Sequence, residues 1–126
     1  MGDRANFGFV TRTGDVVYLY GHWAGNRMMD QLARAIKRVQ IAGRQNDPSY
    51  ATRIAISDIV GEDWDNDLGW GITVNSLDDN EHSVPVVNWE SGHVILYASD
   101  PNTRTAEMKF VMTLDNFVNK FLRVSV

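Results

Sequence analysis

The order of strand-like and helix-like segments most constrains the fold of this chain. Two β-rich segments come first, two helical patterns follow, and three strand-like segments precede a last strand and helix. The β-rich segments are residues 7–11, 16–20, 69–75, 83–89, 93–98 and 107–112. This order predicts a single α+β domain over residues 1–126. We expect an antiparallel or mixed sheet of about five to six strands, with two to three helices on one face.

Turn and capping residues predict the first elements. Gly14 and Asp15 favour a hairpin turn between the first two strand segments. Asn26 is the expected N-cap of the first helix, and Gly43 is its expected end. The apolar face of this helix is predicted to carry Met28, Leu32, Ala35, Ile36 and Val39.

The second helix is predicted from its ends. Asp47 followed by Pro48 is typical of a helix start, and Gly61 is expected to stop the helix after about Val60. A strand is the alternative over residues 51–60, because isoleucines alternate there. Residues 62–68, which are rich in acids, are expected to form a loop.

The C-terminal part contains a second hairpin and a terminal helix. Pro85 predicts that its strand lies at the edge of the sheet, or that residue 85 occupies a position needing no backbone donor. Thr113 is the expected N-cap of the last helix. One side of that helix carries Leu114, Phe117, Val118, Phe121 and Leu122.

Composition narrows the function classes. Hydrophobic residues make up 44% of the chain and charged residues 22%, which is ordinary for a soluble globular protein. The absence of cysteine excludes disulfides, thiolate nucleophiles and cysteine-ligated metal sites. A formal net charge of −4 makes nucleic acid an unfavourable partner. Basic residues gather in 27–44 and acidic residues in 58–67, which predicts a basic side and an acidic side.

The first candidate site is the segment Tyr18-Leu-Tyr-Gly-His-Trp-Ala-Gly25, at the end of a strand. Tyr20, His22 and Trp23 could bind a ligand, with Trp23 as a stacking face and free amides around residues 25–28 accepting an anion. The alternative is structural, because buried aromatic residues most often fill the joint between a sheet and a helix.

A second candidate site lies in Asp47-Pro-Ser-Tyr-Ala-Thr-Arg-Ile54. Tyr50 and Arg53 are three residues apart on the predicted helix, so they could together face an acidic or planar ligand. The alternative is that Arg53 packs on Tyr50 and pairs with a nearby acid. A weaker, anion-facing row of Arg27, Arg34 and Arg38 follows the first helix, although such rows are more often solvated.

Several chemistries lack their required residues. The acids after Asp63 resemble a calcium loop, but Leu68 and Val74 occupy the positions that need glycine and glutamate. The three histidines lie far apart with no zinc-binding spacing, and neither a nucleophile elbow nor a phosphate loop is present. The sequence therefore predicts no catalytic residue, no metal site and no cofactor.

The two candidate segments, together with Gly69-Trp-Gly-Ile72, resemble a family of small uncharacterised proteins encoded by tailed bacteriophages of actinobacteria. The resemblance covers roughly residues 6–97. It implies a non-structural phage product in the cytoplasm of an infected bacterium, and it carries no established activity.

Three functions follow from these observations. The first is a non-enzymatic binding module that sequesters an anionic small molecule, such as a host signalling nucleotide, or blocks a host protein. The second is a protein–protein or homo-oligomeric module that uses an exposed edge strand or the acidic loop. The third is a small hydrolase in which His22 acts with Glu81 or Asp58.

Overall fold

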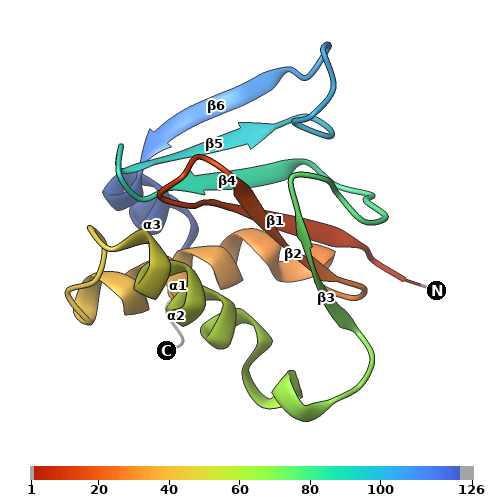
Figure 1. Ribbon diagram of the computed structural model, residues 1–126, viewed down its shortest axis with the longest axis horizontal. Helices are drawn as coiled ribbons and strands as arrows, with labels where there is room; N and C mark the ends of the chain where they lie inside the picture. Colours follow the sequence, from red (N-terminus) through yellow and green to blue (C-terminus); the bar gives the residue numbers. More distant parts are fainter. Residues whose placement is uncertain (1, 123–126) are drawn as a thin grey trace.

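Six strands in the order β3-β2-β1-β4-β5-β6 organise residues 2–122, the part of the chain that the computed structural model describes (Figure 1). The strands are β1 (Ala5–Val10), β2 (Val16–Gly21), β3 (Trp70–Val74), β4 (Val84–Asn88), β5 (His93–Tyr97) and β6 (Met108–Thr113). Neighbours are antiparallel except β1 and β4, which are parallel, so the sheet is mixed. The predicted α+β class and strand number are confirmed.

Three helices cover one face of this sheet. They are α1 (Met28–Ile41), α2 (Pro48–Val60) and α3 (Leu114–Phe121), and α1 contacts both of the others. Side chains from the helices and the sheet share one core, which includes Phe7, Phe9, Leu19, Leu32, Ile36, Ala55, Val94 and Phe117. Across residues 2–122, none of the helices combines the length and apolarity needed to cross a membrane.

Trp89, just after β4, contacts both the sheet and α2. Its ring is almost fully buried and stacks on Phe9 with 6.2 Å between ring centroids. Its Nε1 donates a hydrogen bond to Oγ1 of Thr52, 3.1 Å away. The same bond satisfies a threonine hydroxyl that α2 places in the core, where an unpaired hydroxyl would be costly.

The ends of α2 follow their predicted chemistry. Oδ1 of Asp47 accepts a hydrogen bond from the Tyr50 amide at 3.4 Å, Pro48 begins the helix, and Gly61 ends it with a φ of 56°. The strand alternative for residues 51–60 is therefore wrong. Thr113 caps α3 as predicted, because its hydroxyl accepts a hydrogen bond from the Asn116 amide at 3.1 Å.

Two other boundary predictions are wrong. Asn26 does not cap α1, because it lies inside a short 3₁₀ helix, Gly25–Arg27, and Arg27 occupies the cap position. The Gly25 amide donates to the Asp3 carbonyl at 2.9 Å, so a tertiary contact fixes this turn. The acidic residues after α2 are not all loop, because Gly61–Asp65 forms another 3₁₀ helix.

Pro85 does not mark an edge strand, because β4 lies between β1 and β5 at the centre of the sheet. The parallel pairing with β1 begins only at Val86, one residue after the proline. The edges of the sheet are β3 and β6 instead.

Candidate functional site

The segment Tyr18–Gly25 forms a joint at the end of β2. A Cβ on Gly21 would lie 2.5 Å from the Ala24 side chain and 2.8 Å from the Trp70 ring. A Cβ on Gly25 would overlap Nε2 of His82 and lie 2.5 Å from the Asp3 carboxylate. The two glycines therefore leave room for side chains from distant parts of the sequence.

His22 is held at this joint by its backbone and its ring. Its amide donates to the Gly69 carbonyl, and its carbonyl accepts from the Asp3 amide, both at 2.8 Å. Nδ1 of the ring shares a hydrogen bond with the Tyr20 hydroxyl at 2.8 Å. Trp23 packs edge-on against the same ring with 4.6 Å between centroids, yet its side chain is 63% exposed. His22 thus supports the joint, and Trp23 remains available to a partner.

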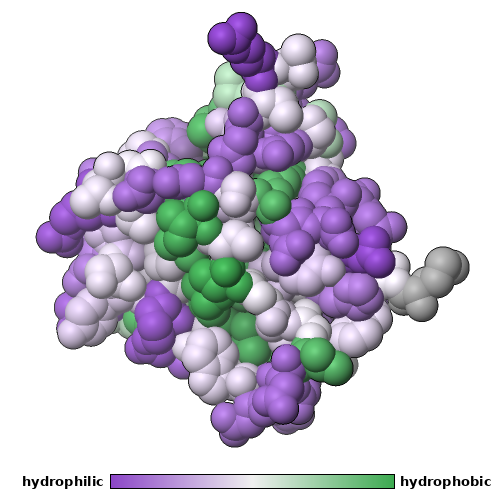
Figure 2. Space-filling view, turned by 45° about the vertical axis from the view of Figure 1, so that its right-hand side comes forward, coloured by the Kyte–Doolittle hydropathy of each residue, from purple (hydrophilic) through white to green (hydrophobic). Residues whose placement is uncertain are grey.

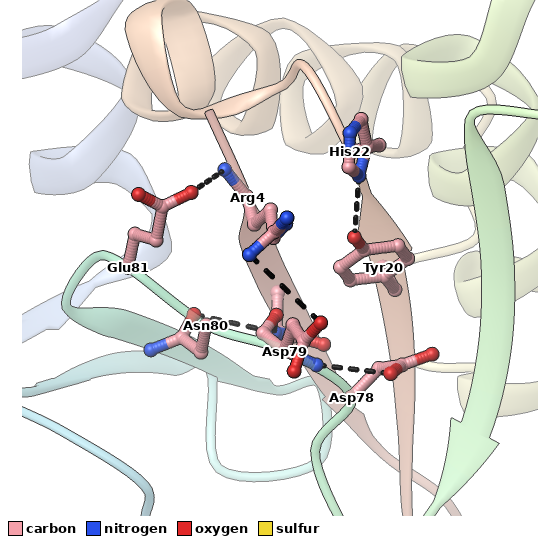
Figure 3. A network of polar contacts seen from close by, with 8 residues as sticks. Arg4, Tyr20, His22, Asp78, Asp79, Asn80 and Glu81 are labelled. Atoms are coloured by element: carbon pink, nitrogen blue, oxygen red, sulfur yellow. Dashed lines mark hydrogen bonds and ion pairs between the residues drawn. The ribbon is translucent and has the colours of Figure 1, made fainter. Parts of the chain in front are cut away.

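The surroundings of Tyr20 and His22 are acidic. Figure 3 shows Arg4 between Tyr20 and the loop that carries Asp78, Asp79 and Glu81. Arg4 Nη1 lies 3.9 Å from Oδ2 of Asp79, and the Arg4 amide donates to Oε1 of Glu81 at 3.0 Å.

Loss of hydration raises the pKa of the Tyr20 hydroxyl, Arg4 opposes the shift, and the three neighbouring carboxylates reinforce it. Tyr20 is therefore a neutral hydrogen-bond partner of His22 at physiological pH. Three carboxylates against one guanidinium also make this place unfavourable for an anionic ligand.

Tyr50 and Arg53 lie at the other end of the β1–β2 hairpin. Arg12, in the hairpin turn, pairs with Asp47 at the start of α2 with 3.8 Å between Nη2 and Oδ1. His22 follows the opposite end of β2, where Gly21 pairs with Ala5. Six residues of strand separate these ends by roughly 17–20 Å. The structure therefore does not bring the two predicted pairs together around one cavity.

The side chains of Tyr50 and Arg53 are engaged locally. The Arg44 guanidinium lies over the Tyr50 ring, 5.2 Å from its centroid. Nη1 of Arg53 donates to the Ser57 hydroxyl at 3.2 Å, one helical turn away. Tyr50 is 55% exposed, so a partner could still reach its ring, but these contacts do not form a shared binding face for Tyr50 and Arg53.

The predicted arginine row is largely paired with acids. Arg27 Nη2 lies 2.8 Å from Oδ2 of Asp30, and Arg38 Nη1 lies 3.5 Å from Oδ1 of Asp58. Arg34 lines a cavity that also contains Asp58 and Glu62. The positive charges of this row are thus balanced by carboxylates nearby.

A cavity of about 720 Å³ opens at the start of α1. It is lined by residues 25–30 with Lys120 and Phe121 of α3. Among the described residues, no side chain caps α1 or the 3₁₀ helix before it. The helix start and the Lys120 side chain suit a small anion, although the Asp30 carboxylate lies in the same wall and pairs with Arg27.

Exposed apolar side chains gather around β3, and of these only Trp23 was named from the sequence as a candidate binding residue. Trp23, Trp64, Leu68, Ile72 and Val74 are each between 56% and 79% exposed, and we call them the β3 surface. Figure 2, turned to bring that side of the molecule forward, shows apolar side chains in a broken band among polar ones. Exposed aromatic and aliphatic side chains gathered in this way commonly mark a protein interface.

Contacts join the members of the β3 surface. The Trp23 ring lies against Gly69, the residue after Leu68. Trp64, Trp70 and Ile72 line a groove of about 260 Å³, with Leu19 and Val60 in its wall and Asp63 at its side. Ile72 pairs with Leu19 and Val74 with Val17, so both side chains point to the helix-covered face. Their exposure means that the helices leave this outer strand partly uncovered. The alternation Trp70-Gly-Ile-Thr-Val74 was visible in the sequence, but its place at an edge was not.

The residues named for a hydrolase lie in separate contacts. His22 is bonded to Tyr20, Glu81 accepts from the Arg4 amide, and Asp58 pairs with Arg38. Within residues 2–122, no group of three or more His, Asp or Glu side chains is placed to hold a metal ion. A scan against protein-family models finds no match for the chain, and comparisons with curated proteins and with solved structures find none either.

Proposed function

We propose that the protein is a non-enzymatic binding module that docks another protein through the β3 surface. The observation that carries this proposal is the exposure of two tryptophans and three aliphatic side chains beside an unpaired strand edge. Tryptophan is among the residues that contribute most to protein interfaces, and monomers rarely leave such groups uncovered without a binding role.

The contacts around the histidine and the arginines also support a binding role over catalysis. His22 has a tyrosine as its ring partner, and Tyr20 keeps its proton at physiological pH because its pKa is raised. The bacteriophage context implied by the sequence resemblance extends the proposal: the partner would be a protein of the infected host, and binding would block that protein.

A crosslinking experiment tests this function. A photo-crosslinking amino acid replaces Ile72 in one variant and Ile41 in another, because Ile41 is also exposed but lies at the end of α1. We expect residue 72, and not residue 41, to crosslink to a discrete protein in an actinobacterial lysate. That protein is then purified for affinity measurements.

The affinity measurement uses matched charge substitutions. Ile72→Asp should weaken binding of the purified partner by about 2 kcal/mol, or roughly thirtyfold, because it buries a carboxylate in an apolar contact. Ile41→Asp should leave the affinity unchanged. Equal crosslinking from both positions, or equal affinities of both variants, would contradict docking at the β3 surface.

A second function is favoured by the cavity at the start of α1. Lys120 and a helix start that no described side chain caps suit an anionic small molecule such as a nucleotide. Thermal-shift measurements with linear and cyclic nucleotides test it, with Lys120→Glu as the variant expected to abolish any shift. Unchanged melting temperatures across the panel would rule this function out.

A further inference from the structure

We propose that β3 accepts an extended segment of the partner as a seventh strand, and that this segment carries Lys or Arg on both sides of an apolar centre. The inference rests on the proposed function, since it specifies what the β3 surface recognises. Three features carry it: the outward backbone groups of β3, the groove beside Ile72 and the charge around both ends of the strand.

The hydrogen-bond register of β3 leaves one set of backbone groups facing outward. The Gly69 carbonyl accepts from the His22 amide, and the Asn75 amide donates to the Val16 carbonyl. Hydrogen-bonded and non-hydrogen-bonded residues alternate along an antiparallel pair. The backbone N–H and C=O groups of residues 69, 71, 73 and 75 therefore point toward β2. Those of Trp70, Ile72 and Val74 point toward the open edge. An added strand can bond these groups without disturbing β2.

The β3 edge lacks the features that usually protect an edge strand. Its residues, Trp70 to Val74, include no charged side chain and no proline, and its pairing with β2 is continuous. The opposite edge, β6, carries Lys109, and its pairing with β5 shifts register between Leu96 and Tyr97. Lysine and bulges discourage strand addition. The sheet is thus protected at β6 and open at β3.

The groove of about 260 Å³ provides a place for a side chain of the added strand. Trp64 and Ile72 line this groove, and the Ile72 side chain points to the helix-covered face of the sheet. A neighbouring strand would lie about 4.8 Å from β3, and alternate residues of that strand would face the groove. A large apolar side chain opposite Ile72 would fill it, which gives the added segment a preferred register.

The acidic residues around β3 favour basic residues at the two ends of the partner segment. Residues 54–103 contain ten Asp and Glu residues and no Lys or Arg, although the net charge of the whole chain is only −4. Glu62, Asp63, Asp65 and Asp67 precede β3, and Asp78 and Asp79 follow it. Acids at both ends of an uncharged strand favour a partner segment with basic residues at both ends.

The same charges disfavour a second copy of this chain at the edge. Antiparallel pairing of two β3 strands about Ile72 would bring the acidic loop before one strand toward Asp78 and Asp79 of the other copy. Like charges brought together in this way cost free energy. The occupant is therefore a different chain, and self-association is an outcome that would contradict the proposal.

Peptide selection tests the segment. The full-length protein is immobilised and used to select from random peptides of about nine residues, long enough for one strand. We expect enriched peptides with Lys or Arg near both ends and alternating apolar residues between them. Binding of the best peptide should weaken at least about tenfold for Ile72→Asp or for Asp65→Lys/Asp67→Lys, but not for Ile41→Asp.

Hydrogen exchange of the complex with the best peptide tests strand addition itself. The outward amides of Trp70, Ile72 and Val74 should exchange more slowly on binding, and those of β6 should not. Methylation of alternate peptide amides should abolish binding, since it removes the donors to β3.

Four outcomes would each overturn the proposal. They are failure to enrich any peptide, enrichment of acidic peptides, unprotected β3 amides, and dimers that protect the same amides. A partner that crosslinks at residue 72 while these amides stay unprotected would overturn strand addition but leave the proposed function standing.

Discussion

Gly21 and Gly25 explain, at the scale of single residues, why aromatic residues and glycines crowd the segment 18–25. Each glycine lies where a side chain from another part of the sequence packs against the backbone. The Trp70 ring covers Gly21, and His82 and Asp3 meet at Gly25. The segment is therefore primarily structural, and of its predicted ligand-binding residues Trp23 alone belongs to the β3 surface.

Replacing Gly21 tests the close approach of Trp70. Gly21→Ala should lower the free energy of unfolding by about 1–3 kcal/mol, because the new Cβ overlaps Ala24 and Trp70. Gly71→Ala is the matched control in the neighbouring strand, where the nearest atom to a new Cβ is 3.8 Å away. Urea denaturation compares the two, and equal losses would contradict this account of Gly21.

Asn75 ties the end of β3 to the first hairpin turn. Its φ is 61°, its Oδ1 accepts from the Val16 amide at 2.8 Å, and its Nδ2 donates to Oδ1 of Asp15 at 3.0 Å. Hydrogen bonds from Asn75 and then Thr13 hold the pKa of Asp15 below its usual range. A lowered native pKa stabilises the fold above the unfolded value, and this stabilisation is lost as the pH falls through the native pKa.

Asn75→Gly should raise the pKa of Asp15 toward its ordinary value. Glycine keeps the left-handed backbone conformation of residue 75 and removes the side-chain hydrogen bonds. An NMR titration of the Asp15 carboxyl carbon measures the change, with Asn66→Gly as a control that leaves Asp15 untouched. An unchanged Asp15 titration in Asn75→Gly would contradict the assigned cause.

At the scale of elements, local chemistry was readable from the sequence and strand neighbours were not. Asp47, Pro48 and Gly61 set the ends of α2 within a few bonds of themselves, so the prediction succeeded. Asn26 failed as a cap because Asp3, far away in the chain, fixes the turn around Gly25. The edge prediction for Pro85 failed because β4 pairs with β1, and pairing over such a distance leaves no local signal.

The candidate site shows the same division. The sequence predicted that Trp23 and Tyr50 could be presented to a partner, and both are exposed. The sequence left open whether their segments meet, and β2 and α2 place them at opposite ends of the hairpin. The sequence predicted an exposed edge strand as a possible interface but did not identify β3 as that strand. An edge strand and a central strand can share the same alternation, and only strand order distinguishes them.

The bond between Trp89 and Thr52 allows a test of how the sheet holds α2. Trp89→Phe should lower the free energy of unfolding by about 1–3 kcal/mol, because it leaves the Thr52 hydroxyl buried and unpaired. Thr52→Val in the same protein should recover part of that loss by removing the hydroxyl. A double-mutant cycle in urea measures the coupling. Strictly additive losses would show that the bond contributes nothing to stability.

The whole molecule consists of two sheet halves joined at β1 and β4. β1 to β3 with α1 and α2 form the first half, and β4 to β6 with α3 form the second. The core is nevertheless continuous, because Phe9, Trp89 and Phe117 belong to one buried cluster. A shared core of this kind favours cooperative unfolding of both halves.

Coincident unfolding curves are therefore expected. Tryptophan fluorescence and far-ultraviolet circular dichroism should give the same urea midpoint, because neither half keeps its core without the other. Hydrogen exchange of the β2 and β5 amides provides an independent comparison. A second transition in either signal would show that the halves unfold separately.

The parallel pairing of β1 with β4 also sets the timing of folding during synthesis. Gly8 pairs with Val86, nearly eighty positions later in the chain. At about 5–20 residues per second, a ribosome needs several seconds to deliver that partner. Until then the nascent chain keeps β1 as an additional unpaired edge. Chaperones should therefore be needed while the chain is being synthesised up to β4, rather than by the finished protein.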